Sequence, residues 1–499
     1  MTRFNQSTMG QDKTTNYEGA VAYKLDPKTE LYTAVCCASL QPKFYQPNEK
    51  DQITQIRNLI LQAPPEFVAK LAVYVREKMY LRSVPLVLAV ELAKIHKGDN
   101  LVSRMTERVI QRADELTEVL AYYQAANSRT GTKKLDKLSK QLQLGLARAF
   151  DKFDTYQFAK YNRQTEIKLR DALFLAHPKP KDKERENLYK QIADDALPVP
   201  YTWEVELSRA GQEGKTKKEV WENLIGSSRL GYMALLRNLR NLLEADISAK
   251  YLEMVYGILI KPEAVAKSKQ LPFRFFSAYQ IINGCGHPRA GYLMEALEKA
   301  VQLSARNLRG FDLDTVVLIA CDVSASMQRG ISPKSAVQFY DIGLMLGMTL
   351  QYSCAAVISG MFGSTWKVIQ MPRTQILQNA LEFRRREGEV GYSTNGYLII
   401  DWLIQERRIV DKVMVFTDCQ MWDSCGWDRS FVDTWHQYKR IAPGAKLYLF
   451  DLAGYGTIPV SIRENGVYLI AGWSEKVFDI LAAIEQGSSA VKEIDKIEL

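Results

Sequence analysis

Residues 315–327, with the sequence TVVLIACDVSASM, decide the fold of the C-terminal part of the chain. The run of β-branched and aliphatic residues is typical of a parallel strand buried on both faces, and its abrupt polar stop marks the carboxyl end. Open α/β sheets bind ligands at that edge. The segment from Asp322 to Ser326 offers one carboxylate and two hydroxyls at alternate positions. Such oxygens suit Mg²⁺, Mn²⁺ or Ca²⁺, and a helix N-cap is the alternative interpretation of so short a pattern.

Short apolar segments alternate with helical ones on the C-terminal side of Gly310. We expect strands at 316–321, 355–362, 366–371, 412–417, 446–450 and 467–470, and helices near 336–352, 397–407 and 431–440. This alternation predicts a doubly wound, mostly parallel sheet of Rossmann type with right-handed connections.

Two further loops strengthen the interpretation of the opening segment as a metal loop. The sequence GYSTNG at 391–396 precedes a helix and supplies the hydroxyl of Thr394, and VMVFTD at 413–418 is a second buried strand that ends in Asp418. In a doubly wound sheet the first and fourth strands can lie side by side, so we expect Asp322 and Asp418 to converge. The predicted ligands of a divalent metal ion, most favourably Mg²⁺, are Asp322, Ser324, Ser326, Thr394 and Asp418.

These five positions resemble the metal-ion-dependent adhesion site of the von Willebrand factor A domain, and the resemblance covers residues 311–499. Tyr392 and Ser393 replace the more usual glycine pair, which puts the loop geometry in question more than the ligation. Such a site lets a carboxylate or phosphate of a partner complete the coordination. Hydrolysis would need a second ion or a base, and we interpret the nearby Asp423 and Asp428 as surface charge and a helix N-cap.

Composition indicates an ordinary globular protein of two or three domains. The chain has 499 residues, of which 46% are hydrophobic and 25% charged. Its N-terminus shows no leader pattern, and no apolar run reaches eighteen residues. The seven cysteines form no zinc-type framework, which favours reduced thiols. We therefore expect a cytoplasmic protein that does not engage a membrane.

The net charge of +9 is unevenly distributed. From residue 312 onward there are 18 basic and 22 acidic residues, a balance of −4, whereas residues 1–311 hold 48 basic and 35 acidic residues, a balance of +13. The excess favours a polyanionic partner for the N-terminal part, with surplus lysine on solvated helix faces as the alternative.

The N-terminal part follows a helical pattern after a polar segment, 1–19, that we expect to be flexible. Apolar residues recur at three- and four-residue steps up to about residue 310, for example at Leu235, Leu236, Leu239, Leu242 and Leu243. Helices of this length with short turns predict antiparallel pairs stacked as in a solenoid, although no fixed sequence period is present.

The densest basic stretch is 129–170, with eleven Lys or Arg residues. Arg148 and Lys152 are four apart and so share a helix face. Such a stripe matches phosphates, and the neighbouring Tyr156, Phe158 or Tyr161 could stack on bases. The alternative is a solvated face with these aromatic residues in the core.

The whole chain resembles the TROVE-domain Ro ribonucleoproteins, and a bacterial Ro protein in particular. The resemblance spans about residues 20–499 and rests on LRDALFLAHPKP at 169–180, YTWEVELS at 201–208 and MALLRNLRNL at 233–242. It implies that residues 20–310 form a ring of HEAT-type helical hairpins whose two ends an A domain joins. It also implies small non-coding Y RNA on the outer basic surface, single-stranded ends of misfolded RNA in the hole, a role in RNA quality control, and in bacteria a tethered exoribonuclease.

The resemblance also assigns RNA contacts to a helix and loop at 160–179. Lys160 falls on a basic contact of the family and His177 on a family histidine, whereas Gln164 departs from a second basic contact. The basic neighbours that can replace it, together with the remaining candidates, are Arg163, Lys168, Arg170, Lys179, Arg148 and Lys152.

Our first hypothesis is a monomeric, non-enzymatic RNA-binding protein of a ribonucleoprotein. The alternative is an adhesion module whose metal ion captures an acidic residue of a protein partner, with the helices as its scaffold. A metal-dependent nuclease is the third and least favoured hypothesis.

Overall fold

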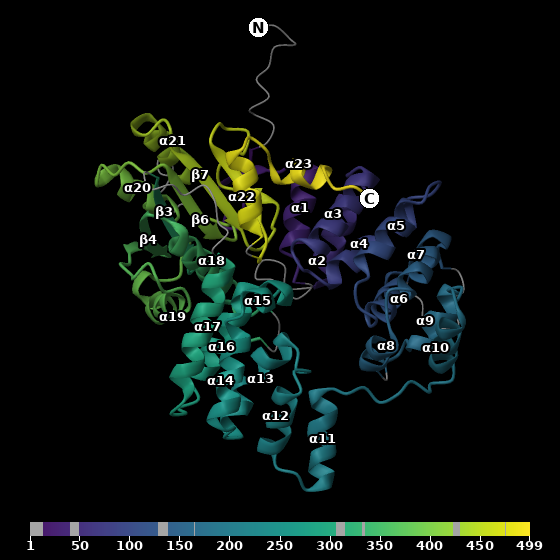
Figure 1. Cartoon of the computed structure of the whole chain (residues 1–499). Coiled ribbons are helices and arrows are strands. Elements are labelled where there is room, and N and C mark those ends of the chain that lie inside the picture. Colours follow the sequence, from purple (N-terminus) through teal and green to yellow (C-terminus); the bar gives the residue numbers. More distant parts are fainter. Residues whose placement is uncertain are drawn as a thin grey trace. The chain divides into compact units, whose positions relative to one another are not determined.

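The computed structural model describes residues 13–39, 49–127, 138–163, 165–305, 315–331, 335–422, 430–474 and 476–499. Within these ranges the chain is mostly helical, with a six-stranded and a three-stranded sheet (Figure 1). None of the helices in the described part is both long and apolar enough to cross a bilayer. The helical and α/β classes predicted for the two parts of the chain are therefore confirmed.

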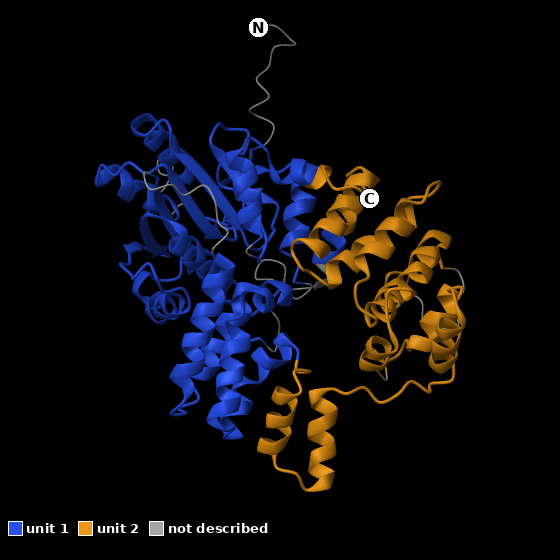
Figure 2. Cartoon of the chain, viewed as in Figure 1, with its two compact units in different colours: residues 1–56, 231–493 blue, residues 57–230, 494–499 orange. Residues whose placement is uncertain are grey.

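The chain divides into two compact units, coloured in Figure 2. The first comprises residues 1–56 and 231–493, and the second comprises 57–230 and 494–499. The boundary that we predicted at residue 310 lies inside the first unit, because helices on its N-terminal side pack against the helices of the α/β part.

The six-stranded sheet of the first unit has the order β5-β4-β3-β6-β7-β9. All neighbouring pairs are parallel except β4 with β5. The opening segment forms β3, which lies between β4 and β6, so the first and fourth predicted strands are adjacent as expected. The strands are β3 Val316–Asp322, β4 Ala356–Phe362, β5 Trp366–Val368, β6 Lys412–Thr417, β7 Lys446–Asp451 and β9 Val467–Ala471.

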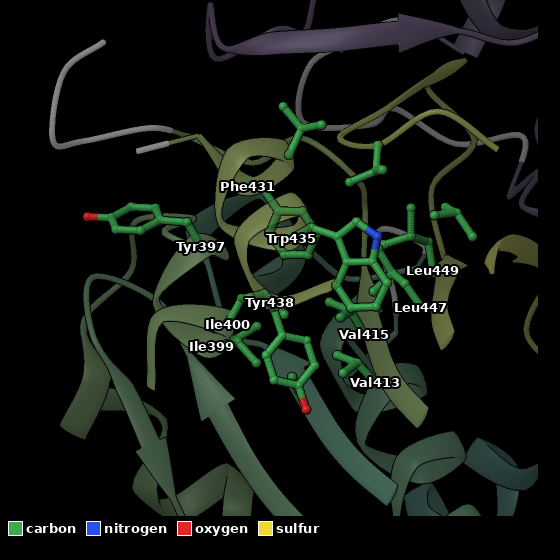
Figure 3. Close-up of a cluster of buried hydrophobic side chains, with 14 of the residues drawn as sticks. Tyr397, Ile399, Ile400, Val413, Val415, Phe431, Trp435, Tyr438, Leu447 and Leu449 are labelled. Carbon is green, nitrogen blue, oxygen red and sulfur yellow. The ribbon is translucent and has the colours of Figure 1, made fainter. Parts of the chain in front are cut away.

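Helices cover both faces of this sheet. Figure 3 shows side chains of α20 (Tyr397–Gln405) and α21 (Phe431–Ile441) pointing toward Val413 and Val415 of β6. On the other face α18 (Phe339–Ser353) approaches so closely that a Cβ on Gly347 would lie 3.1 Å from the Cys321 sulfur. Each fully buried aliphatic side chain contributes about 1.5–3 kcal/mol, which explains why the middle residues of the central strands are apolar. The remaining helices are α19 Leu377–Arg386, α22 Val477–Glu485 and α23 Ala490–Asp495.

A short N-terminal hairpin belongs to the first unit, and this corrects our expectation of a flexible segment. Strands β1 (Lys13–Thr15) and β2 (Val21–Lys24) pair antiparallel, and β2 also pairs with β8 (Thr457–Ile458). The Asn16 side chain accepts the backbone N–H groups of Glu18 and Ala20, both at 3.0 Å, which fixes the turn. Residues 1–12 lie outside the described part of the chain.

The helices of the first unit that precede the sheet pack onto it through α16 and α17, which contact both α18 and α19. Glu298 of α17 accepts the backbone N–H groups of Ile376 and Leu377 at 2.5 and 2.9 Å, and so caps α19. The helices are α1 Pro27–Cys36, α13 Tyr232–Glu244, α14 Ala249–Leu259, α15 Pro262–Ser268, α16 Pro272–Asn283 and α17 Ala290–Ala305.

The second unit is a stack of helices in which α3 packs on α4 and α5, α4 on α6, α5 on α7, and α7 on α9. This packing of near neighbours agrees with the predicted stacking of short helices. Helix α2, Glu49–Ile60, spans the boundary between the units. The others are α3 Pro65–Glu77, α4 Ser83–Ile95, α5 Leu101–Val109, α6 Glu115–Ala126, α7 Lys140–Phe150, α8 Thr155–Tyr161, α9 Leu169–Ala176, α10 Lys183–Ala193, α11 Trp203–Glu213 and α12 Lys217–Gly226.

Candidate functional site

The predicted metal ligands meet at the carboxyl edge of the large sheet. Asp322 ends β3 and Asp418 follows β6, and because these strands are paired in parallel their ends lie together. Ser324 and Ser326 follow β3, at the start of a short 3₁₀ helix, and their hydroxyl oxygens are 3.2 Å apart. Thr394 lies just before α20.

All five predicted ligands are buried, with exposed fractions between 1% and 7%. A cavity of about 250 Å³ opens beside them. Three of the ligands, Ser324, Ser326 and Thr394, line this cavity, and its other lining residues are Glu18, Ala325, Tyr392, Ser393 and Trp422.

The surroundings of Asp322 and Asp418 disfavour the charged form of both carboxylates. Burial raises the pKa of Asp322, partly offset by hydrogen bonds from Ser324 and Thr417. Burial also raises the pKa of Asp418, and the negative charge of Asp322 raises it further. Oxygen Oδ2 of Asp418 accepts no hydrogen bond within the described part of the chain. A cation between the two carboxylates would relieve both the repulsion and the missing interaction.

The donor set fits a hard divalent cation. Its atoms are two carboxylates and three hydroxyls, which are the oxygen ligands that Mg²⁺ prefers. Across the described ranges, no group of three His, Cys, Asp or Glu side chains is placed to hold a metal ion. Any ion at this edge therefore depends on the hydroxyls of Ser324, Ser326 and Thr394, and the set does not suit zinc.

Hydrogen bonds and close packing hold the loop at 391–396, whose geometry the sequence left in question. The backbone carbonyl of Tyr392 accepts the N–H of Ala325 at 3.0 Å, which joins this loop to the one that follows β3. Gly391 has φ of +70°, and a Cβ on Gly363 would lie 2.0 Å from the Gly391 carbonyl oxygen. Two glycines thus permit the close approach, while Tyr392 and Ser393 are accommodated at the cavity wall. Asp423 and Asp428 lie outside the described residues.

Sequence reasoning missed several residues that support the ligands. Thr417 donates its hydroxyl to Asp322 at 2.6 Å, and Gln420 donates its backbone N–H to Asp418 at 3.0 Å. Gln420 also accepts the backbone N–H of Tyr17 at 3.0 Å, which brings the N-terminal hairpin to this edge. Thr417 looks like one more strand residue in the sequence. The only local sign of the hairpin is the Asn16 to Gly19 turn signal.

The basic residues predicted on 160–179 are mostly exposed. They occupy α8, the following loop, α9 and its C-terminal cap. The ammonium of Lys160 lies 5.7 and 5.6 Å from the ring centres of Tyr156 and Tyr161. His177 ends α9 in the left-handed conformation, with φ of +51°. The exposed residues are Lys160, Arg163, Arg170, His177 and Lys179, and Lys168 is half-buried.

The second basic row makes contacts within the protein. The Lys152 ammonium donates to the carbonyl oxygens of Glu107 and, at 3.1 Å, Ile110, at the end of α5. Desolvation at this position lowers the pKa of Lys152. Arg148 lies 3.7 Å from a carboxylate oxygen of Glu107. Lys152 thus caps a helix, and the RNA contacts of both residues stay predictions. The basic Lys133 and Lys137, and Gln164, lie outside the described residues.

The aromatic residues near the basic row have different environments. Phe158 is fully buried and its ring lies 5.7 Å from those of Phe150 and Phe153, so for this residue the alternative of a core side chain holds and base stacking does not. Tyr156 is 45% exposed. Tyr161 is half-buried, and the guanidinium carbon of Arg112 lies 4.4 Å from the centre of its ring. The two residues are far apart in the sequence, so sequence patterns did not predict this contact.

Comparisons with known proteins place this architecture in a family. The TROVE domain matches residues 18–196 and 194–287, more than half of the chain. Telomerase protein component 1 of Mus musculus is 26% identical over 338 residues, and that of Rattus norvegicus is 25% identical over 339 residues. Each match covers 52% of this chain and 13% of the relative, so the chain spans a small part of their length.

A solved structure matches a larger share of this chain than the curated relatives do. The crystal structure of the Ro (RSR) protein of Deinococcus radiodurans aligns with 92% of this chain and 100% of its own, with a TM-score of 0.59 and 18% sequence identity. This match shows a shared fold and agrees with the resemblance to Ro proteins. Together with the extent of the domain match, it shows that the chain belongs to the TROVE-domain family.

Proposed function

We propose that this chain binds RNA as the protein component of a ribonucleoprotein, in a role that is not catalytic. The observation that carries the proposal is the exposure of Lys160, Arg163, Arg170, His177 and Lys179 within twenty residues of one another. Membership of the TROVE-domain family, which includes the Ro proteins, supports it.

The finer assignments rest on the resemblance to Ro proteins. In this proposal a small non-coding, Y-like RNA binds the basic surface on 160–179, and the single-stranded ends of misfolded RNA enter the hole of a HEAT-type helical ring. The protein would serve RNA quality control in the cytoplasm as a monomer, with an exoribonuclease as a further partner.

The basic surface has the chemistry that RNA backbones require. Flexible, exposed Lys and Arg side chains neutralise phosphates and release counterions, so affinity falls with salt by a logarithmic slope of about −0.7 per phosphate for single strands. Lys160 beside Tyr156 combines a charge with an exposed aromatic face, an arrangement that can hold a phosphate and an unpaired base together.

The test is binding of a structured small RNA at several salt concentrations by the wild type and by a Lys160→Glu, Arg163→Glu double variant. We expect the double variant to lose at least tenfold in affinity and about two phosphates' worth of salt slope. The matched control is Lys217→Glu with Lys218→Glu, an exposed lysine pair on α12 of the same unit. Equal losses in both double variants would refute the assignment to 160–179.

A second function is favoured by the convergence of the five oxygen ligands. We propose that residues 311–499 form a von Willebrand A domain in which Asp322, Ser324, Ser326, Thr394 and Asp418 hold Mg²⁺, which then binds an acidic group of a partner. Titration calorimetry should show one Mn²⁺ or Mg²⁺ bound per chain and none in Asp322→Ala. A wild type that binds neither ion would refute the site. RNA binding and metal-dependent adhesion are compatible in one molecule.

A further inference from the structure

Cationic and aromatic side chains alternate on the surface that includes Lys160. The Lys160 ammonium lies 5.7 Å from the ring centre of Tyr156 and 5.6 Å from that of Tyr161. The guanidinium carbon of Arg112, from the segment between α5 and α6, lies 4.4 Å from the centre of the same Tyr161 ring. Two cations and two rings thus follow one another without a gap.

The alternation continues into a segment outside 160–179. Tyr156 donates its hydroxyl to the backbone carbonyl of Tyr201 at 3.1 Å. The guanidinium carbon of Arg229 lies 5.1 Å from the centre of the Tyr201 ring. All these residues belong to the second unit. Their contacts define what we call the aromatic–cationic row, which consists in order of Arg112, Tyr161, Lys160, Tyr156, Tyr201 and Arg229.

The helical hairpin of α11 and α12 brings Tyr201 and Arg229 together. Helix α11 begins two residues after Tyr201, α12 ends three residues before Arg229, and the two helices pack on each other (Figure 1). The rings of Trp203 and Trp221 stack at 5.8 Å and hold the hairpin closed. Because the two ends of a helical hairpin meet, residues from both ends share one surface.

The members of the row are accessible to a ligand and are held in position. Lys160 and Arg229 are exposed, as is Tyr156, whereas Tyr201 and Tyr161 are half-buried. Arg112 is oriented by Asp114, whose two carboxylate oxygens accept from its guanidinium at 3.0 and 2.8 Å. The tyrosines therefore present part of their rings at fixed places between mobile charges.

This alternation matches the chemistry of an unpaired RNA strand, in which bases and phosphates also alternate. Unpaired bases stack on aromatic rings with little regard to sequence, and Lys or Arg side chains neutralise the phosphates between them. A duplex keeps its bases paired and stacked, so it can use the cations of such a surface but not the rings.

We propose that the aromatic–cationic row binds an unpaired segment of RNA in preference to a duplex. Tyr156 and Tyr201 stack on bases, Lys160 and Arg229 contact phosphates, and Arg112 extends the cationic side of the row. This inference rests on the RNA-binding function proposed above. It adds Arg112, Tyr201 and Arg229, which lie outside 160–179, and it specifies the form of RNA that this surface takes.

The experiment measures the binding of an RNA oligonucleotide of about ten nucleotides, alone and annealed to its complement, at several salt concentrations. The variants are Tyr201→Ala, Tyr201→Phe, which keeps the ring, and Arg229→Ala. The matched control is Arg209→Ala, because Arg209 is an exposed arginine of the same helical hairpin that lies outside the row and pairs with Glu206 at 3.2 Å. Thermal unfolding of each variant reports on its fold.

Tyr201→Ala should bind the single strand about tenfold more weakly and the duplex within about twofold of the wild type. Tyr201→Phe should bind both like the wild type, since the stacking surface is retained. Arg229→Ala should lose about 0.7 of the logarithmic salt slope for the single strand, and Arg209→Ala should keep the wild-type slope.

Two results would overturn the role of the row and leave the proposed function standing. The first is wild-type affinity for the single strand in both Tyr201→Ala and Arg229→Ala, while Lys160→Glu with Arg163→Glu still loses the structured RNA. The second is an equal loss for single strand and duplex in Tyr201→Ala, because stacking on a ring cannot weaken a fully paired RNA. A wild type that binds no RNA would overturn both proposals.

Discussion

The hydroxyl of Thr417 donates a 2.6 Å hydrogen bond to Oδ2 of Asp322 and joins β6 to β3 at the ligand edge. Both residues are buried, and the other oxygen of Asp322 accepts the backbone N–H of Ser324 at 2.9 Å. The carboxylate is therefore oriented by two donors from different strand ends. Thr417 is not one of the five proposed ligands, yet together with the Ser324 N–H it sets the direction in which Asp322 presents its oxygens.

Replacing Thr417 with valine should weaken metal binding while the fold is retained. The change is nearly isosteric but leaves Asp322 with one donor fewer, so we expect a 10- to 100-fold loss of Mn²⁺ affinity. The free energy of unfolding should fall by about 1–3 kcal/mol. Thr434→Val removes another buried hydroxyl, which donates to the carbonyl of Ser430 at the N-cap of α21, and serves as the control. Equal affinities in the two variants would contradict the orienting role.

Removal of divalent metal should destabilise the protein. Two buried carboxylates repel each other without a cation, and an ion at 100 times its dissociation constant stabilises the folded state by about 2.7 kcal/mol. Thermal unfolding in Mg²⁺ and in chelator should differ accordingly. Asp418→Asn removes the repulsion, so its stability in chelator should exceed that of the wild type and should not respond to Mg²⁺. A Mg²⁺ response retained in Asp418→Asn would argue against the site.

Lys152 and Lys160 should respond oppositely to the same substitution. Lys152→Met leaves the Ile110 carbonyl without its donor, so we expect a loss of about 1–3 kcal/mol in unfolding free energy and a smaller loss of RNA affinity than in Lys160→Met. Lys160→Met removes an exposed charge and should weaken RNA binding with little effect on stability. Denaturant unfolding and RNA titration of both variants check the contrast. A larger loss of RNA affinity in Lys152→Met would reverse the assignment.

Substitutions of Phe158 and Tyr156 should also have opposite effects on stability and RNA affinity. Phe158→Ala leaves a cavity between Phe150 and Phe153 and should cost about 3–5 kcal/mol of stability. Tyr156 is exposed, so Tyr156→Ala should leave stability nearly unchanged and weaken the binding of single-stranded RNA by about 1–3 kcal/mol. Oligonucleotide titration and thermal unfolding separate the two effects. Unchanged RNA affinity in Tyr156→Ala would show that no base stacks on this ring.

The sequence predicted the sheet and its ligand edge because both follow from local signals. The strand Lys412–Thr417 is buried at every position and has an unbroken apolar centre at 413–416, which is typical of a parallel sheet covered on both faces, and Asp418 directly after it marks the edge. The adjacency of β3 and β6 then follows from a general rule of strand order. The positions of Asp322 and Asp418 required no further information.

The features that sequence reasoning missed depend on pairs of residues far apart in the chain. Glu298 looks like a surface glutamate of an amphipathic helix, and its role becomes visible only when the N–H groups of Ile376 and Leu377 lie beside it. Lys152 continues a basic row by its spacing, yet the free carbonyl groups at the end of α5 attract it. The tertiary structure determines which of several possible partners a side chain contacts. The spacing of residues along one helix carries no information about those partners.

The pairing of β2 with β8 has a consequence for the order of synthesis. Tyr23 lies opposite Ile458, so the hairpin waits for about 430 residues of chain before its partner strand exists. At ribosomal rates of about 5–20 residues per second this delay is roughly 20–90 s. Until then the edge of β2 is unpaired and open to other strands or to chaperones. The ligand edge can therefore gain its hairpin only after Thr457 and Ile458 have been synthesised.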